Sequence, residues 1–261
     1  MILANLVKAI REQNYYAVVL EFLIVIAGVV IGFQIQAWNQ TRAIAQEEYN
    51  SLVRLQDESE VILEFWTEEV RREREFNKDR RFALEALTLG TLAEDDQERF
   101  ELGLFTMGFY PTFNPPSDVY NELISSGGLA KISDLAAREA VAVYVRELTY
   151  ITGQLVQFRP TTEWLEEAAK GLIYYTYNPD LFTLMEADFN FEDLAGDREY
   201  VSAQVTGVRN QIIFFRYRQN TLAAALDMCR EVSRAVEMTC EGVVAAQAEV
   251  DMPLWSEPGN E

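Results

Sequence analysis

The stretch from Tyr16 to Trp38 reads YAVVLEFLIVIAGVVIGFQIQAW, and its central part, Phe22–Phe33, holds no charged or polar side chain. As a helix, the whole stretch would be about 33 Å long, which matches the hydrocarbon core of a bilayer. The run is too long, and too aliphatic on every side, to suit the buried helix of a soluble protein. We therefore predict a transmembrane anchor over residues 15–39.

The ends of this apolar run indicate that the anchor is retained rather than cleaved. A signal peptide needs small residues at its cleavage site, and Gln36-Ala37-Trp38 provides a poor one. Tyr15, Tyr16 and Trp38 bracket the run, and such aromatic side chains favour the boundary between lipid and water. We predict that these three residues are interfacial anchors.

A short amphipathic pattern precedes the anchor. Lys8 and Arg11 lie beside apolar residues at helical spacing, namely Ile2, Leu3, Leu6, Val7 and Ile10. This pattern is typical of a helix that lies on a membrane surface. We predict such a helix over residues 1–14.

One face of the anchor carries small and polar residues at steps of three or four. We call it the packing stripe, and its members are Glu21, Val25, Gly28, Gly32, Gln36 and Asn39. A Gly-x-x-x-Gly pair allows two helix backbones to approach closely, and the polar members can hydrogen-bond across the contact. The pair alone is a weak signal, but here it is aligned with the only carboxylate in the span. We predict that the stripe packs against a helix of another membrane subunit or of a second copy.

Glu21 leaves two interpretations open, because an ionisable group within a membrane span is a candidate functional residue. It either hydrogen-bonds a neighbouring helix, or it binds and releases protons as the single-helix stator partners of ion-driven motors do. Those partners resemble this chain in layout only.

The orientation of the anchor follows from indirect signals, because Lys and Arg counts at its two ends show no clear bias. The N-terminal tail is short, the following domain is acidic and its two cysteines suit an oxidising compartment. We expect a bacterial inner-membrane protein that crosses once, with its N-terminus in the cytoplasm and its C-terminal domain in the periplasm.

Composition excludes several classes of function. The 42 acidic and 22 basic residues give a net charge of −20, which repels nucleic acid. The chain has no histidine, which removes His-based catalysis, His-ligated haem and the usual transition-metal sites. Carboxylate chemistry and calcium or magnesium binding stay open, yet no pattern selects particular acids. We expect no enzyme activity, no catalytic residues, no cofactor and no metal.

Cys229 and Cys240 are the only cysteines. On one straight helix they would stand about 16 Å apart, too far for a disulfide. A bridge needs the chain to turn between them, and Glu237–Gly242 could supply that turn. An exported domain favours the bridge over two free thiols.

The periodicity after Asn39 is overwhelmingly helical, and no strand pattern stands out. We predict an all-α fold, in which the single N-terminal transmembrane helix continues into a stalk and an antiparallel helical bundle. The predicted acidic helical domain covers 40–250 and the tail 251–261. Within the domain we expect the stalk helix at 41–89, further helices at 94–108, 118–126, 134–158, 160–175 and 198–237, and an irregular stretch at 178–197.

The segment FYPTFNPP, residues 109–116, interrupts the helices with three prolines and three aromatic residues. In one interpretation it docks a partner through Phe109, Tyr110, Phe113, Pro115 and Pro116. In the other, which is the simpler, the loop is tucked against the bundle.

Two motifs resemble an uncharacterised family of bacterial single-pass inner-membrane proteins. Members begin with an E-aliphatic-G-aliphatic-QxxxWN anchor and carry an ELxSSGxLxxIxDxxLR type motif about 80 residues later. The first motif is carried here by Glu21, Gly32, Gln36, Trp38 and Asn39, with Gln36 two rather than four residues before the tryptophan. Most of the second motif matches, at Glu122, Leu123, Ser125, Ser126, Gly127, Leu129, Ile132, Asp134 and Arg138. The resemblance covers roughly the first 145 residues and implies an anchored bacterial envelope protein, and it carries over no established activity.

These observations favour a structural or accessory subunit, which joins a larger inner-membrane assembly or a homo-oligomer through the stripe and the periplasmic domain. One alternative is a periplasmic sensor or binding module, although the short cytoplasmic tail is too small to signal alone. Another alternative is a proton-linked, stator-like subunit that uses Glu21. The expected partners are the lipid bilayer and other membrane subunits or a second copy, and no nucleic acid.

Overall fold

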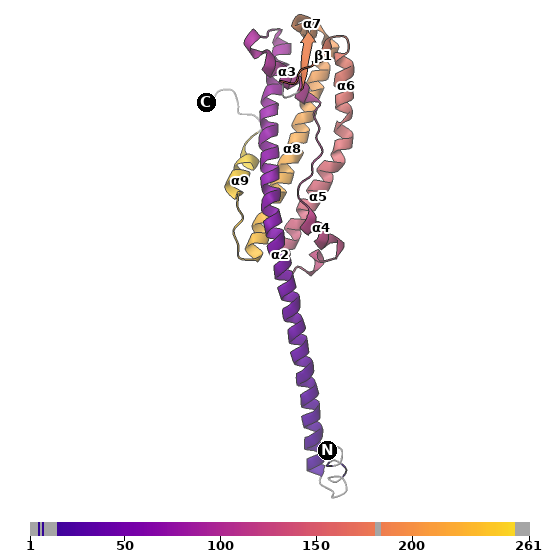
Figure 1. Ribbon diagram of the computed structural model, residues 1–261, viewed down its shortest axis with the longest axis vertical. Coiled ribbons are helices and arrows are strands. Elements are labelled where there is room, and N and C mark those ends of the chain that lie inside the picture. The colour runs from indigo at the N-terminus through magenta and orange to yellow at the C-terminus, as the bar shows by residue number, and fades with distance from the viewer. Residues whose placement is uncertain (1–4, 6, 8–14, 181–183, 254–261) are drawn as a thin grey trace. The chain divides into compact units, whose positions relative to one another are not determined.

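The computed structural model describes residues 5, 7, 15–180 and 184–253, and within these the fold is helical as expected (Figure 1). Most of the predicted surface helix, 1–14, and most of the tail, 251–261, lie outside the described residues. The chain divides into two compact units, Met1–Ser51 and Leu52–Glu261.

The helix α2 runs without a break from Tyr15 to Leu89, so the predicted anchor and the predicted 41–89 helix are one helix. It ends at Gly90, which has a φ of +68°, a conformation that suits glycine. The N–H groups of Gly90 and Thr91 donate to the carbonyl oxygen of Ala86 and close the last turn.

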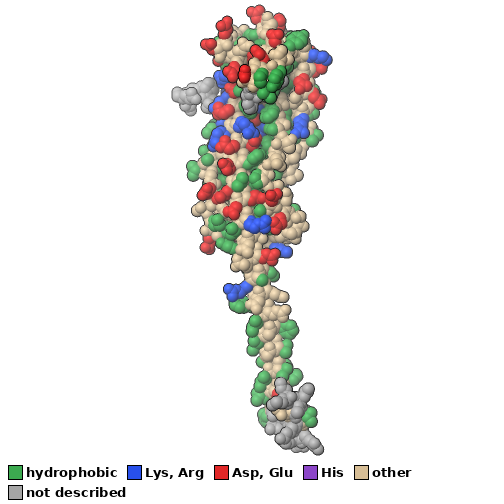
Figure 2. All heavy atoms as spheres, viewed as in Figure 1, with side chains coloured by type: hydrophobic (Ala, Val, Ile, Leu, Met, Phe, Trp, Pro, Cys, Tyr) green, Lys and Arg blue, Asp and Glu red, His purple; other side chains and the backbone are tan. Residues whose placement is uncertain are grey.

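The first unit consists of the part of α2 up to Ser51, as far as the structure describes it. This part is long and apolar enough to cross a membrane, and none of the residues in its most apolar window is buried. Figure 2 shows this unit covered mainly by hydrophobic side chains on the face in view, whereas acidic and basic side chains are spread over the second unit.

The second unit is a bundle around the long helix α8, Arg198–Ala235. In Figure 1, α8 runs antiparallel to α2 and to α5, Leu135–Phe158. The other helices are α3, Gln97–Met107; α4, Asp118–Ser125; α6, Pro160–Ala169; α7, Phe191–Gly196; and α9, Val243–Asp251, with 3-10 turns at Glu94–Asp96 and Leu129–Lys131.

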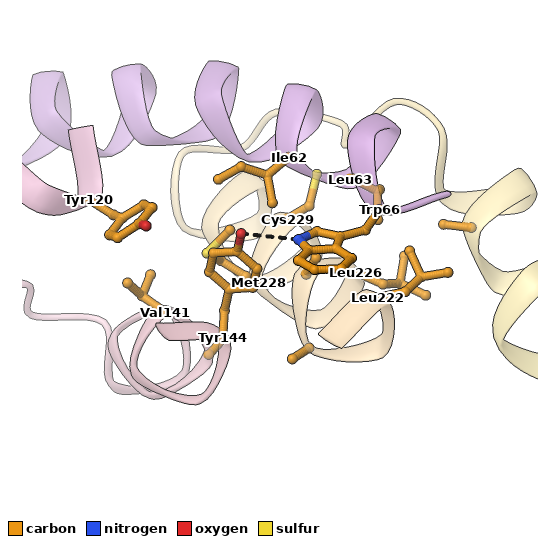
Figure 3. Close-up of a cluster of buried hydrophobic side chains, with 14 of the residues drawn as sticks. Ile62, Leu63, Trp66, Tyr120, Val141, Tyr144, Leu222, Leu226, Met228 and Cys229 are labelled. Atoms are coloured by element: carbon orange, nitrogen blue, oxygen red, sulfur yellow. Dashed lines mark hydrogen bonds between the residues drawn. The ribbon is translucent and has the colours of Figure 1, made fainter. Parts of the chain in front are cut away.

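The bundle has two hydrophobic clusters. The larger one joins α2, α4, α5, α8 and α9, and it includes Trp66, Tyr144, Leu222 and Cys229. Figure 3 shows the indole N–H of Trp66 donating to the hydroxyl of Tyr144 at 3.2 Å, which satisfies a polar group within this cluster. The smaller cluster lies at the α3 and α7 end of the bundle, around residues such as Phe100 and Tyr200.

A two-stranded sheet is a departure from the predicted fold. The strands β1, Ile173–Tyr177, and β2, Met185–Phe189, pair antiparallel with Ile173 opposite Phe189. The expected helix at 160–175 therefore ends early, at Ala169, and the stretch expected to be irregular contains β2 and α7. The run IYYTY is rich in β-branched and aromatic residues, which favour a strand, and Gly171, with a φ of +80°, turns the chain before it.

Candidate functional site

The packing stripe lies along an unbroken helix, so its members share one face of α2 as predicted from their spacing. An added Cβ at Gly28 or Gly32 would meet nothing within 4 Å, so neither glycine is explained by packing against another described part of the chain. Val25 and Trp38 are exposed, as is Tyr16. The guanidinium of Arg42 lies 4.8 Å from the centre of the Trp38 ring. The side chain of Tyr15 lies outside the described residues.

The loop at 109–116 is tucked against the bundle over most of its aromatic surface. Tyr110 and Phe113 are each only 7% exposed, and Pro115 is also buried. Tyr110 stacks on Phe158, while Phe113 lies against Trp66. The docking interpretation therefore does not hold for these three residues, which the bundle buries as the simpler interpretation expects.

The course of the 109–116 segment explains why these side chains are buried. The segment between α3 and α4 passes along the bundle from one end toward the other, so its bulky side chains fill the core that the helices leave (Figure 1). Phe109 and Pro116 of the predicted docking set stay exposed.

A disulfide joins Cys229 and Cys240, whose Cα atoms are 5.8 Å apart. α8 ends at Ala235, and Glu237 adopts a φ of +57° before the chain turns into α9. The chain thus turns between the two cysteines within Glu237–Gly242, the segment expected from the sequence. Cys229 is fully buried in the larger cluster, so the bridge fastens the α8–α9 connection to the core.

The motif residues at 122–138 have structural contacts. The carboxylate of Glu122 pairs with Arg54 of α2 at 2.6 Å, and this pairing lowers the pKa of Glu122. Asp134 accepts a hydrogen bond from the N–H of Ala137 and so caps α5, and its carboxylate also pairs with Arg234 of α8 at 2.8 Å. The motif thus joins α4 and α5 to α2 and α8.

α4 receives its N-terminal cap from another helix. Ser117, at the N-cap position, makes no side-chain cap. Instead the carboxylate of Glu58 in α2 accepts from the N–H groups of Val119 and Tyr120, at 2.8 and 3.0 Å. These are among the N–H groups that a helix leaves without internal partners.

Sequence reasoning missed a buried ionic cluster formed by Glu73, Arg80 and Arg218. Oε1 of Glu73 lies 2.5 Å from Nη1 of Arg80 and 2.9 Å from Nη1 of Arg218, and both arginines have no exposed surface. Arg80 also donates to the carbonyl oxygen of Thr106 and to the amide oxygen of Asn77. The cluster connects α2, α3 and α8 through charged groups. Buried contacts between helices are usually made by apolar side chains instead.

The charges in this cluster do not balance by themselves, since one carboxylate lies between two guanidinium groups. Burial lowers the pKa of Arg218, and the charge of Glu73 opposes that effect. The Arg218 guanidinium also lies 4.7 Å from the ring of Phe214, on the ring face that attracts cations. The path of α8 decides which of the charges on α2 are buried.

A cavity of about 510 Å³ lies among α3, α6, β1 and α8. Its walls are mostly apolar, and they include the buried polar residues Tyr200 and Gln204 of α8. Among the described residues, no group of three or more His, Cys, Asp or Glu side chains is placed to hold a metal ion.

Searches of protein-family models, of curated proteins and of solved structures found no match to this chain.

Proposed function

We propose that this chain is a membrane-anchored structural or accessory subunit of a bacterial inner-membrane assembly. Its packing stripe contacts a helix of another subunit or of a second copy, and its acidic helical domain lies in the periplasm and contacts the rest of the assembly. The observation that carries the proposal is the apolar run of α2, which is exposed and whose glycines approach nothing else in the described chain.

The chemistry of the stripe supports a helix as its partner. Between lipid chains, apolar side chains alone give no preference for one helix over another, whereas close backbone approach and interhelical hydrogen bonds do. Gly28 and Gly32 allow the approach, and Glu21 and Gln36 provide the hydrogen-bonding groups on the same face. The aliphatic remainder of the helix faces lipid in this arrangement.

The mass of the particle extracted from native membranes in mild detergent tests the proposal. We expect a complex with fixed stoichiometry, either with other subunits or with further copies of this chain. Changing both Gly28 and Gly32 to Leu should release the chain as a monomer, because the larger side chains separate the backbones. Ala27→Leu makes the same kind of change away from the stripe and should leave the complex intact. A monomer from the unmodified membrane would contradict the proposal.

Glu21 gives a finer test of the same contact. Gln keeps a hydrogen-bonding side chain while Leu does not, so Glu21→Gln should retain the complex and Glu21→Leu should weaken it. Equal loss in both variants would exclude a simple hydrogen-bonding role.

The orientation is tested separately with an alkaline phosphatase fused after Glu261, because this enzyme is active only in an oxidising compartment. Activity supports a periplasmic domain, and its absence places the domain in the cytoplasm.

A further inference from the structure

The cavity among α3, α6, β1 and α8 has the size of a small-molecule site. Its volume of about 510 Å³ falls within the roughly 300–1,000 Å³ typical of ligand pockets. All its lining residues belong to the Leu52–Glu261 unit, and α3, β1 and α6 meet at one end of that unit in Figure 1.

The walls are apolar and the charges lie at the edge. Leu104 and Phe105 come from α3, Leu165 and Ala169 from α6, and Ile173 from β1. The only ionisable acid or base side chains in the lining are Glu166 and Lys170, and both are exposed. An ionised ligand group deep in the cavity would therefore lose its hydration without gaining an opposite charge.

Two buried polar side chains of α8 line the cavity. Tyr200 is 1% exposed and Gln204 is 3% exposed, and four residues of helix place them on one face. The Tyr200 hydroxyl and Oε1 of Gln204 have no hydrogen-bond partner among the described residues. Buried polar atoms are almost always satisfied, so two unsatisfied atoms on residues that line one cavity indicate a missing partner.

We propose that this cavity binds a small uncharged molecule with an aromatic or short alkyl body and one hydroxyl or N–H group. The body packs against Leu104, Leu165 and Ile173, and the hydroxyl or N–H donates to Oε1 of Gln204. The Tyr200 hydroxyl donates to the oxygen of a ligand hydroxyl. Burial raises the pKa of Tyr200, which keeps that hydroxyl protonated as a donor. This site is independent of the membrane contact proposed above.

The test uses the full chain in lipid nanodiscs and three related molecules in equilibrium dialysis: 2-naphthol, naphthalene and 2-naphthoate. Empty nanodiscs measure partition into lipid, which is subtracted. We expect saturable binding of one 2-naphthol per chain. Naphthalene, which lacks the hydroxyl, should bind at least about tenfold more weakly, because it loses the hydrogen bonds to both Gln204 and Tyr200. The charged naphthoate should show no saturable binding.

Variants locate the binding. Ala169→Trp places a large side chain in the cavity and should abolish saturable binding, whereas Glu167→Trp places the same ring on an exposed position of α6 and should not. The double variant Tyr200→Phe and Gln204→Leu should bind 2-naphthol no better than naphthalene. Because the Tyr200 hydroxyl and Oε1 of Gln204 lack a partner, this double variant should melt no lower than the original protein when no ligand is present.

Three results would overturn the proposal: no saturable binding of 2-naphthol, equal binding to the Ala169→Trp and Glu167→Trp variants, or equal affinity for 2-naphthol and naphthalene. A drop in melting temperature for the double variant without ligand would also contradict it, since the two polar atoms would then have internal partners such as buried water.

Discussion

In α2 the apolar side chains of the first part are exposed and some charged side chains of the second part are buried, the opposite of the usual pattern. Before Ser51 the helix exposes aliphatic side chains such as Ile24 and Ile31, and after Leu52 it buries Glu73 and Arg80. The backbone is the same α-helix throughout, so the difference lies in what surrounds each part. The first part is suited to lipid, where exposed aliphatic groups carry no cost, while in the second the buried carboxylate of Glu73 lies between the guanidinium groups of Arg80 and Arg218.

The largest effect is expected when charged side chains replace apolar ones in the first part of α2. Changing Ile26 and Val30 to Arg places two charges near the centre of the apolar run, at about 3 kcal/mol each, or about 6 kcal/mol for insertion. The chain should then become extractable from membranes by alkaline carbonate. The same pair of arginines at Gln40 and Ile44, beyond the run, should leave the chain resistant. Resistance in both variants would show that the run does not span the bilayer.

The matching change in the second part is Glu73→Leu, which leaves Arg80 and Arg218 buried without their shared carboxylate. Removing one partner of a buried ion pair costs about 3–5 kcal/mol, and urea unfolding of the full chain measures it. Glu75→Leu, on an exposed part of the same helix, should change the free energy of unfolding by less than about 0.5 kcal/mol.

Replacing the whole cluster sharpens this result. Leu at Glu73 together with Met at both arginines should recover most of the lost stability, because no charge then remains without a partner. If the triple variant stays as unstable as Glu73→Leu, the cost arises from packing rather than from charge.

The disulfide should contribute less. For a loop of 11 residues, the chain-entropy model gives about 3 kcal/mol, and changing both Cys229 and Cys240 to Ala should lower the free energy of unfolding by about that amount. A reductant should destabilise the original protein similarly and leave the double variant unchanged. Neither treatment should alter carbonate extraction, which depends on the first part of α2.

The smallest expected change in the free energy of unfolding is that of Asp134→Ala. The substitution removes the α5 cap and the contact with Arg234, at a cost of about 1 kcal/mol at neutral pH. The pKa of Asp134 is lowered from 3.8, chiefly by the hydrogen bond from Ala137 and further by Arg234. The contribution of the ionised carboxylate is therefore complete above pH 3.8 and is lost as the pH falls through the lowered pKa. Unfolding curves of the two proteins should differ at neutral pH and converge in strong acid.

Features set by local sequence were predictable. The apolar run, the glycine that ends α2 and the Asp134 cap each depend on residues within a few positions of one another. The β1–β2 hairpin was missed although its strand residues are also local, because the helical periodicity of the preceding segment was extended too far, to Tyr175.

Features set by the path of distant segments were not predictable. Glu73 and Arg218 come together only through the course of α8, and their charges give no sign of burial when each helix is considered alone. The buried aromatic residues of the 109–116 loop show the same limit, since a loop rich in Phe and Pro suits docking as well as core packing. Likewise the cavity requires α3, α6, β1 and α8 at once, so Tyr200 and Gln204 had no distinguishing signal.

The buried charges of α2 also have a consequence during synthesis. Glu73 leaves the ribosome 145 residues before Arg218, a delay of roughly 7–29 s at the usual rate of about 5–20 residues per second. Throughout that interval Glu73 lacks Arg218, and the many charged side chains of the later part of α2 make it a poor substrate for the machinery that inserts helices into membranes. The insertion machinery can therefore distinguish the two parts of one continuous helix before the bundle has formed.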